Sequence, residues 1–209
     1  MTSEPDSALH GDAANPSRRE QILRAAAQLF AERGSRAVGV DDVGAAVGVT
    51  GPAIYRHFAS KDAMLAEMLL RISERLLAGG TERIAAAGED PAGQLRALVD
   101  FQVDFALDNP ALITVQDRDL GALSDRDARQ VRQLQRRYVE EWVAVLARLH
   151  PDASTAACRA RAHAVFGLIN STPHSAGRLT RAAMAALLAG MAVAAATAGD
   201  SVGAAHVGQ

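Results

Sequence analysis

The chain has 209 residues, with 22 lysines and arginines against 24 aspartates and glutamates, and a formal net charge of −2. This balance argues against a protein that coats nucleic acid by bulk charge, although it leaves a local basic patch open. Aromatic residues make up only 4% of the chain, and glycine and proline cluster instead of recurring every ten residues, which argues against a sandwich or barrel of many short strands. Because alanine, leucine and arginine are good helix formers, the composition predicts an all-α fold.

The cysteine content and the length of the apolar runs argue against a disulfide-bonded, a zinc-binding and a membrane-spanning protein. Cys158 is the single cysteine, so the chain cannot form an internal disulfide, and one cysteine does not make a zinc site. We expect no metal site and no cofactor. No N-terminal apolar stretch follows a basic region, so no signal peptide is expected. The longest apolar run, residues 184–198, has about 15 residues, fewer than the roughly 20 of a spanning helix. The expected location is the cytoplasm, with no membrane partner.

The N-terminal region is predicted to hold an arm and a first helix. Residues 1–16 carry three acidic residues, no lysine or arginine, two prolines and no periodicity, which is typical of a disordered arm. Apolar residues then recur at helical spacing and predict a helix over 17–33. Gly34 follows directly, and glycine is a common C-terminal stop because it accepts a left-handed backbone.

Two short helices joined by a tight turn come next. The first is expected over 40–47, with acidic residues in its first turn, where they suit the helix dipole. Gly48 ends it. Thr50 can cap the second, which carries Pro52 in its first turn, where the missing N–H costs nothing. This arrangement predicts a helix-turn-helix unit inside a domain that spans residues 17–63.

Residues 64–198 also have helical patterns throughout. Ser60 can cap a fourth helix with an apolar stripe at 3.6 spacing, and beyond Gly79 and Gly80 the pattern is again helical. Further helical segments are expected over 91–108, 111–115, 124–150, 154–171 and 179–198, with a polar loop at 117–121 and a break at 172–177. Residues 199–209 are expected to form a frayed tail.

The second short helix carries groups suited to nucleic acid. Ile54 and Phe58 are expected to hold it against the first helix. Its outward side chains combine small residues, an aromatic residue with a hydroxyl, and donors for phosphate. In such units the N-terminal residues of the helix read base edges in the major groove, while phosphate contacts set its position. The outward and flanking residues are Gly51, Pro52, Tyr55, Arg56, Arg18, Arg19, His57 and Lys61.

A specific signature ends this unit, since Tyr55, His57 and Phe58 are followed three residues later by Lys61. Together with the turn Gly48-Val49-Thr50, residues 18–65 resemble, almost continuously, the DNA-binding domain of the TetR family of transcriptional regulators. The resemblance implies phosphate contacts for Tyr55, His57 and Lys61. It places the following residues at the recognition helix: Thr50, Gly51, Pro52, Ala53 and Arg56. Two residues depart from the family pattern, because Gly39 lacks the usual cap hydroxyl and Asp41 is acidic at a DNA-contacting position.

The resemblance also implies a larger helical domain for ligand binding and dimerisation, which residues 64–198 fit by length and order. In that family a ligand cavity lies between the helices, so core residues can also line it. The candidate ligand-binding residues are Phe101, Phe105, Tyr138, Trp142 and Phe166, with Gln116, His163, Asn170 and His174 as polar groups. Residues 166–175 also resemble an actinobacterial branch with acyl-CoA or lipid-related effectors.

The last two helices are predicted to form the interface of a homodimer, because small residues let helices approach closely. The alternative is a tightly packed pair within one chain. A two-fold dimer reads a palindrome, whereas a single helix-turn-helix unit binds weakly. The interface candidates are Ala160, Ala164, Gly167, Ala182, Ala186, Leu187, Ala189, Gly190, Val193 and Ala194.

These features predict a ligand-responsive transcriptional regulator. The favoured function is a repressor that binds a palindromic operator in double-stranded DNA as a homodimer and is released by a small apolar or amphipathic effector. A ligand-dependent activator of the same family is the alternative. A helical enzyme is a more distant one, because the sequence holds no HExxH, GxSxG, GxxxxGK[ST] or CxxC pattern. We therefore predict no catalytic residues.

Overall fold

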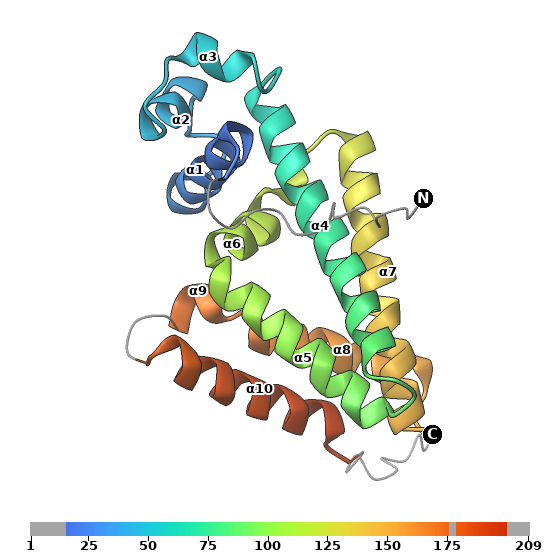
Figure 1. Cartoon of the computed structure of the whole chain (residues 1–209). Helices are drawn as coiled ribbons and strands as arrows, with labels where there is room; N and C mark the ends of the chain where they lie inside the picture. Colours follow the sequence, from blue (N-terminus) through green and yellow to red (C-terminus); the bar gives the residue numbers. More distant parts are fainter. Residues whose placement is uncertain (1–15, 176–178, 200–209) are drawn as a thin grey trace, which may run out of the picture.

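The computed structural model describes residues 16–175 and 179–199, and in these ranges all regular structure is helical. A small N-terminal head of three helices sits at one end of a longer helical body (Figure 1). The all-α prediction is confirmed. The predicted arm, apart from Pro16, and the predicted tail, apart from Gly199, lie outside the described residues.

The head consists of three helices: α1 (Arg18–Arg33), α2 (Val40–Ala46) and α3 (Gly51–Tyr55). Ser17 and Glu20 form a capping box at the start of α1, which satisfies two backbone N–H groups that the helix leaves unpaired. Gly34 and Gly48 end the first two helices with φ angles of 86° and 70°, a left-handed backbone that glycine adopts readily. The order and limits of these helices agree with the sequence prediction.

Apolar side chains from all three head helices and from the start of the next helix form one buried cluster. Ile22 and Phe30 of α1, Val43 of α2 and Ile54 of α3 are each fully buried. Burying a side chain of this size contributes about 1.5–3 kcal/mol, so this cluster holds the short helices in place although five to seven residues alone would not form a stable helix. The orientation of α3 is therefore set by the core beneath it.

The long helix α4 (Lys61–Ala86) starts in the head and runs through the body, and the side chain of Ser60 caps its N-terminus. It continues through Gly79 and Gly80, where the sequence suggested an interruption. A Cβ on Gly79 would lie 2.3 Å from Cζ of Phe101, and one on Gly80 would lie 2.5 Å from Cε2 of Tyr138. The two glycines thus allow aromatic rings from other helices to pack directly on the backbone of α4.

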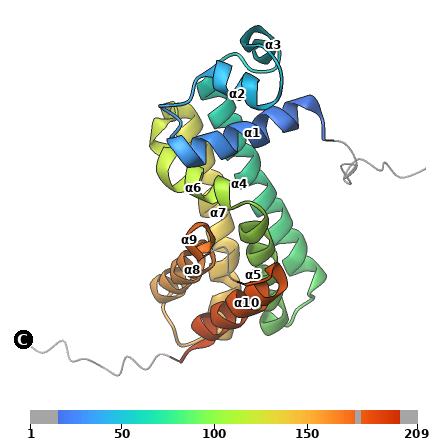
Figure 2. The same ribbon diagram turned by 90° about the vertical axis from the view of Figure 1, so that its left-hand side faces the viewer.

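The body is completed by the remaining helices, with α5 and α7 packed against α4, and α10 packed against α5 and α8 (Figures 1 and 2). Their bounds are α5 (Pro91–Asp108), α6 (Pro110–Asp119), η1 (Leu120–Ala122), α7 (Asp125–Leu149), α8 (Thr155–Ile169), α9 (Thr172–Ser175) and α10 (Arg181–Thr197).

Two predicted irregular segments are helical in the structure. The expected polar loop at 117–121 is instead the end of α6 and most of η1. Arg118 there donates to the carbonyls of Phe30 and Ala31 at the end of α1, contacts from about 90 residues away along the chain that no local pattern reveals. The expected break at 172–177 begins with the short helix α9, which is anchored because the buried hydroxyl of Thr172 donates to the carbonyl of Ala106 (3.2 Å).

Candidate nucleic-acid interface and ligand cavity

The helix α3 forms the exposed tip of the head. Tyr55 is 56% exposed, which is high for a large aromatic residue, and Thr50, Pro52 and Arg56 are exposed as well. Ala53 is half-buried beside them. An exposed aromatic side chain with no packing role on this helix is a feature of a binding surface rather than of a core.

Three of the predicted phosphate donors lie close together. Arg18, Arg56 and His57 line one hollow of about 170 Å³ at the side of α3, together with Ala53. Arg18 is exposed and also donates to the carbonyl of Val47 (3.3 Å). Lys61 is placed apart from this hollow, where its Nζ donates to the carbonyl of Arg36 (3.4 Å). The four donors therefore lie at two places on the head, the hollow beside α3 and the start of α4.

Arg19 has a different environment from the other predicted donors. Its guanidinium pairs with the carboxylate of Glu67 on α4 and donates to the carbonyl of His57. The same group lies over the ring of Phe58, 4.2 Å from its centre. These contacts join α1, α4 and the segment that follows α3, so Arg19 links parts of the head, and each of its three guanidinium nitrogens donates one hydrogen bond within the head.

The first residue of the exposed helix is packed against an acidic neighbour. Gly51 is buried, and a Cβ there would lie 2.0 Å from Oδ1 of Asp41. No residue with a side chain fits this position unless Asp41 moves. Gly39 at the start of α2 supplies no hydroxyl, and its N–H donates to Oδ2 of Asp42 (2.7 Å). One departure from the family pattern, Asp41, thus places a carboxylate beside the start of α3, and the other, Gly39, removes a hydroxyl at the start of α2.

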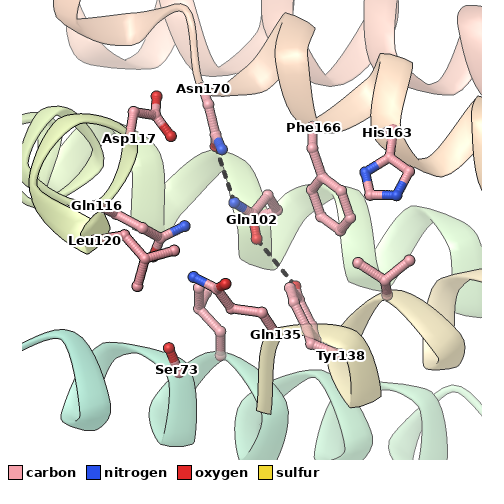
Figure 3. A pocket seen from close by; sticks show the side chains of 12 residues that line it. Ser73, Gln102, Gln116, Asp117, Leu120, Gln135, Tyr138, His163, Phe166 and Asn170 are labelled. Carbon is pink, nitrogen blue, oxygen red and sulfur yellow. Dashed lines mark hydrogen bonds between the residues drawn. The ribbon is translucent and has the colours of Figure 1, made fainter. Parts of the chain in front are cut away.

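The body contains a cavity of about 340 Å³ between α4, α5, α6, η1, α7 and α8 (Figure 3). This volume is near the lower end of the range of roughly 300–1,000 Å³ for ligand pockets. Five of the nine predicted ligand residues line it: Gln116, Tyr138, His163, Phe166 and Asn170. Of these, His163 lies at an exposed position of α8.

The other four predicted ligand residues lie elsewhere. Phe101 packs on Gly79, and Phe105 faces a different cleft. Trp142 is fully buried behind the cavity wall, with its ring centre 4.9 Å from that of Phe166. His174 is exposed on α9. Phe101, Phe105 and Trp142 thus lie on helix faces that do not line the cavity, and His174 is not a lining residue although its charge acts on Asp117 at the cavity edge.

Sequence reasoning missed several lining residues: Ser73, Leu76, Gln102, Asp117, Leu120, Gln135 and Val139. One of them had a detectable signal. Gln102 occupies a position of the apolar stripe of α5 and is only 2% exposed. A polar residue on a buried stripe needs hydrogen-bond partners, so such a position points to a polar network.

That network crosses the cavity wall. The hydroxyl of Tyr138 donates to Oε1 of Gln102 (3.0 Å), and Nε2 of Gln102 donates to Oδ1 of Asn170 (3.1 Å), as Figure 3 shows. Burial raises the pKa of Tyr138, so its hydroxyl remains a neutral donor. Asp117 lies at the edge of the same cavity, and burial raises the pKa of its carboxyl, an effect that the charge of His174 partly offsets. Apart from Asp117 and His163, the polar side chains that line the cavity are amides and hydroxyls, which carry no charge.

A second cleft of about 540 Å³ lies between the head and the body, bordered by α1, α4 and the junction of α5 and α6. Three arginines line it: Arg24, Arg71 and Arg75. Arg71 pairs with Glu67 (2.9 Å), and the guanidinium of Arg75 lies 5.8 Å from the ring centre of Phe105. This arginine cleft is chemically different from the body cavity.

One helix connects the cavity to the head. Gln116 and Asp117 of α6 line the cavity, whereas the next two residues, Arg118 and Asp119, bind the head. Oδ1 of the buried Asp119 accepts from the hydroxyl of Ser35 (2.8 Å), in the segment between α1 and α2. A change in the cavity wall can therefore reach the head through a single turn of α6.

Two further kinds of site are absent from the described ranges. Within residues 16–175 and 179–199, no cluster of His, Cys, Asp or Glu side chains is suited to holding a metal ion. In the same ranges, no helix combines the length and the apolar character needed to cross a membrane.

Comparisons with known proteins agree with this architecture. Residues 22–68 match the family model of bacterial regulatory proteins of the tetR family, and residues 88–196 match that of tetracyclin repressor-like C-terminal domains. The structure of the ketosteroid transcriptional regulator KstR2 of Mycobacterium tuberculosis has a similar fold, with a TM-score of 0.74 and 23% identity over 86% of this chain and 94% of that one.

The curated relatives include both a repressor and an activator of transcription. The chain is 34% identical to the HTH-type transcriptional repressor KstR2 of Rhodococcus jostii over 62% of this chain and 63% of that protein. It is 35% identical to the HTH-type transcriptional activator FasR of Mycolicibacterium smegmatis over 42% and 40% of the two lengths. The chain thus matches less than two thirds of the length of either relative. The two family models together cover most of the chain, and it belongs to the TetR family, whose members are transcription regulators and not enzymes.

Proposed function

We propose that this protein is a ligand-responsive repressor, which occupies a palindromic DNA operator as a homodimer and leaves it when a small effector fills the body cavity. The observation that carries the proposal is the double role of α6. Consecutive residues of this helix line the cavity and bind the head, so the two sites share one rigid element.

The exposed face of α3 is suited to the major groove. Tyr55 and Pro52 project from it, and Arg18, Arg56 and His57 form a hollow at its side where a phosphate fits. Phosphate contacts by these groups and by Lys61 would position the helix, and its first residues would meet the bases. Arg19 acts indirectly here, because it holds the end of α3 in place.

The dimer is proposed to form through exposed faces of α8 and α10. In the single chain Leu187 and Met191 are each 48% exposed, although both are large apolar residues. They lie among small exposed residues of the two helices: Ala160, Ala164, Gly167, Ala182, Ala186, Gly190 and Ala194. Ala189 and Val193 are half-buried against the body. An apolar surface of this kind favours pairing with a second copy, which also supplies the second head that a palindrome needs.

The proposed response to the effector is a shift of population. An effector that fits the cavity best when α6 has moved would favour heads that are spaced wrongly for the operator. The loss of DNA affinity cannot exceed the difference in the effector's affinity for the two states, and a hundredfold loss corresponds to about 2.7 kcal/mol. The acyl-CoA or lipid-related effectors considered from the sequence are one source of such a ligand.

Selection from a random library of duplex DNA tests the DNA-binding part of this proposal. We expect the wild-type chain to enrich an inverted repeat, and the double variant Y55A/K61A to enrich no common sequence. If the wild type enriches nothing that the variant does not, the proposed operator binding is wrong.

The activator FasR among the curated relatives keeps activation as a second candidate. The two functions differ in one measurement. When the genomic promoter that carries the selected operator drives a reporter, removal of a repressor raises transcription, whereas removal of an activator lowers it.

A further inference from the structure

We infer that the part of the effector held in the body cavity is an uncharged molecule with a carbonyl or hydroxyl group, recognised by the carboxamides of Gln116, Gln135 and Asn170. This inference rests on the proposed function, because it takes the cavity as the effector site. It narrows the ligand from any apolar or amphipathic compound to a neutral one.

The carboxamides dominate the polar lining of the cavity. Gln102, Gln116 and Gln135 come from three different helices and Asn170 directly follows a fourth, α8, and each carboxamide has both donor and acceptor groups. Gln102 is already engaged, since it accepts from Tyr138 and donates to Oδ1 of Asn170. Because the Oδ1 of Asn170 is occupied, its NH₂ group is the part available to a ligand. The buried network therefore presents a fixed donor to an acceptor such as a carbonyl oxygen.

Two of the amides are free to bind a ligand. Gln116 of α6 and Gln135 of α7 extend toward one another from different walls of the cavity (Figure 3). Among the described residues neither side chain has a hydrogen-bond partner, whereas Gln102 and Asn170 do. A carbonyl or hydroxyl of a ligand placed between them would satisfy groups that are otherwise left to water. Gln116 belongs to the helix that binds the head, so this contact is also the one that the response to the effector requires.

The charges around the cavity oppose an anionic ligand. None of the described lining residues is lysine or arginine, and Asp117 is a carboxylic acid. A carboxylate or phosphate here would lose its hydration without gaining a cation, and would be repelled by Asp117 when that group is ionised. His163 lies at an exposed position at the edge of the cavity.

The rest of the cavity wall is apolar, and a tryptophan whose fluorescence can report ligand binding lies behind it. Leu76, Leu120, Val139 and Phe166 supply surface for the carbon skeleton of the ligand. The ring centre of Trp142, the single tryptophan of the chain, lies 4.9 Å from that of Phe166 and 6.3 Å from that of Tyr138. A ligand that touches Phe166 and Tyr138 should therefore change the fluorescence of Trp142.

The test compares neutral and charged probes of the same shape on the full chain at pH 8. The linear pair is dodecanamide and dodecanoate, and the planar pair is 2-acetylnaphthalene and 2-naphthoate. Calorimetry measures the binding of all four probes, and quenching of Trp142 fluorescence measures the binding of the linear pair as well. We expect at least one neutral probe to bind ten times or more tightly than its anionic counterpart.

Matched variants show where the probe binds. Q116L/Q135L keeps side-chain volume and breaks no existing hydrogen bond, and should weaken the neutral probe by tenfold or more. Q130L/Q133L changes two exposed glutamines of α7 in the same way and should weaken it by less than twofold. D117N should strengthen dodecanoate by fivefold or more and change dodecanamide by less than threefold.

Four results would overturn the inference. The first three are a preference for the neutral probe of less than tenfold in both pairs, no binding by either neutral probe, and neutral binding that Q116L/Q135L leaves unchanged. Dodecanoate binding that R24Q/R75Q abolishes would place the effector in the arginine cleft and would also contradict the inference. Selection of operator DNA on the same samples separates these failures from a failure of the proposed function, because DNA binding does not depend on the class of ligand.

Discussion

At the residue scale, Arg18 and Arg19 are adjacent in sequence but have different surroundings. Both were expected to contact DNA. Arg18 is exposed and lines the hollow beside α3, whereas Arg19 contacts Glu67, the carbonyl of His57 and the ring of Phe58. A helix turns about 100° per residue, so neighbours face different directions. Only the position of α4 shows which of the two faces the interior of the head.

Substituting Arg19 should therefore affect stability first. We expect R19A to lower the free energy of unfolding by about 1–2 kcal/mol, because it removes charged hydrogen bonds and a cation–π contact. R18A should change the same quantity by less than about 0.5 kcal/mol, as surface substitutions usually do. Urea denaturation measures both. Equal stabilities of the two variants would contradict the internal role of Arg19.

Tyr55 and Lys61 should affect DNA binding first. Because Tyr55 is 56% exposed, Y55A should change stability by less than about 0.5 kcal/mol, yet weaken operator binding about tenfold or more, equivalent to about 1.4 kcal/mol. K61A should lower the slope of log K against log salt by about 0.9, the value for one phosphate contact. Fluorescence anisotropy over a salt series measures the operator affinity and its salt slope, and urea denaturation measures the stability. R129A on α7 is the control. Unchanged affinity and slope in the folded dimer would mean that α3 does not dock as proposed.

At the element scale, α4 shows how tertiary contacts override local signals. Two consecutive glycines usually weaken a helix, yet α4 continues through Gly79 and Gly80 to Ala86. The rings of Phe101 and Tyr138 occupy the space where the two Cβ atoms would be. The glycines thus serve close packing between helices rather than a turn.

Because of this packing, we expect a glycine-to-alanine substitution in α4 to lower the stability of the protein, the opposite of its usual effect in a helix. Replacing a helical glycine by alanine normally stabilises a helix by about 1 kcal/mol. G80A should instead destabilise the protein by about 1–3 kcal/mol, because the new methyl group displaces Tyr138. Thermal and urea denaturation measure this loss of stability. A78G, at the exposed neighbouring position, gives the difference in helix propensity between glycine and alanine without any change in packing. A stabilised G80A variant would disprove the close contact.

At the scale of the whole molecule, the exposed apolar face of α8 and α10 favours the homodimer over a pair packed only within one chain. L187E should leave the subunit folded, since Leu187 is 48% exposed in the single chain, and should shift it from dimer to monomer. Sedimentation measures the mass, and operator affinity should fall by about a hundredfold or more as one half-site is lost. A144E on the exposed side of α7 is the control. A dimeric L187E variant would place the interface elsewhere.

The contact between head and body gives the second prediction at this scale. S35A removes the hydrogen bond from Ser35 to Asp119, which should cost about 1 kcal/mol and loosen the head against α6. Hydrogen exchange should become faster for the amides at the end of α1 and at 34–38, and stay unchanged in α7. Equal exchange in the two proteins would show that this bond does not couple the head to the body.

The sequence by itself determined the helical class, the order of the helices and the helix-turn-helix unit. These features depend on residues within about four positions of one another, such as the cap at Ser60 and the stops at Gly34 and Gly48. Such local patterns are readable in one chain without its neighbours.

Only the tertiary structure decided which side chains face the cavity and which hold the fold together. Phe166 and Trp142 both looked like core or cavity residues, yet the first lines the cavity and the second lies behind it. Arg118 and Asp119 looked like loop residues, yet they bind the head. The physical reason is that these roles depend on contacts between residues far apart in the chain, which arise only when the helices pack.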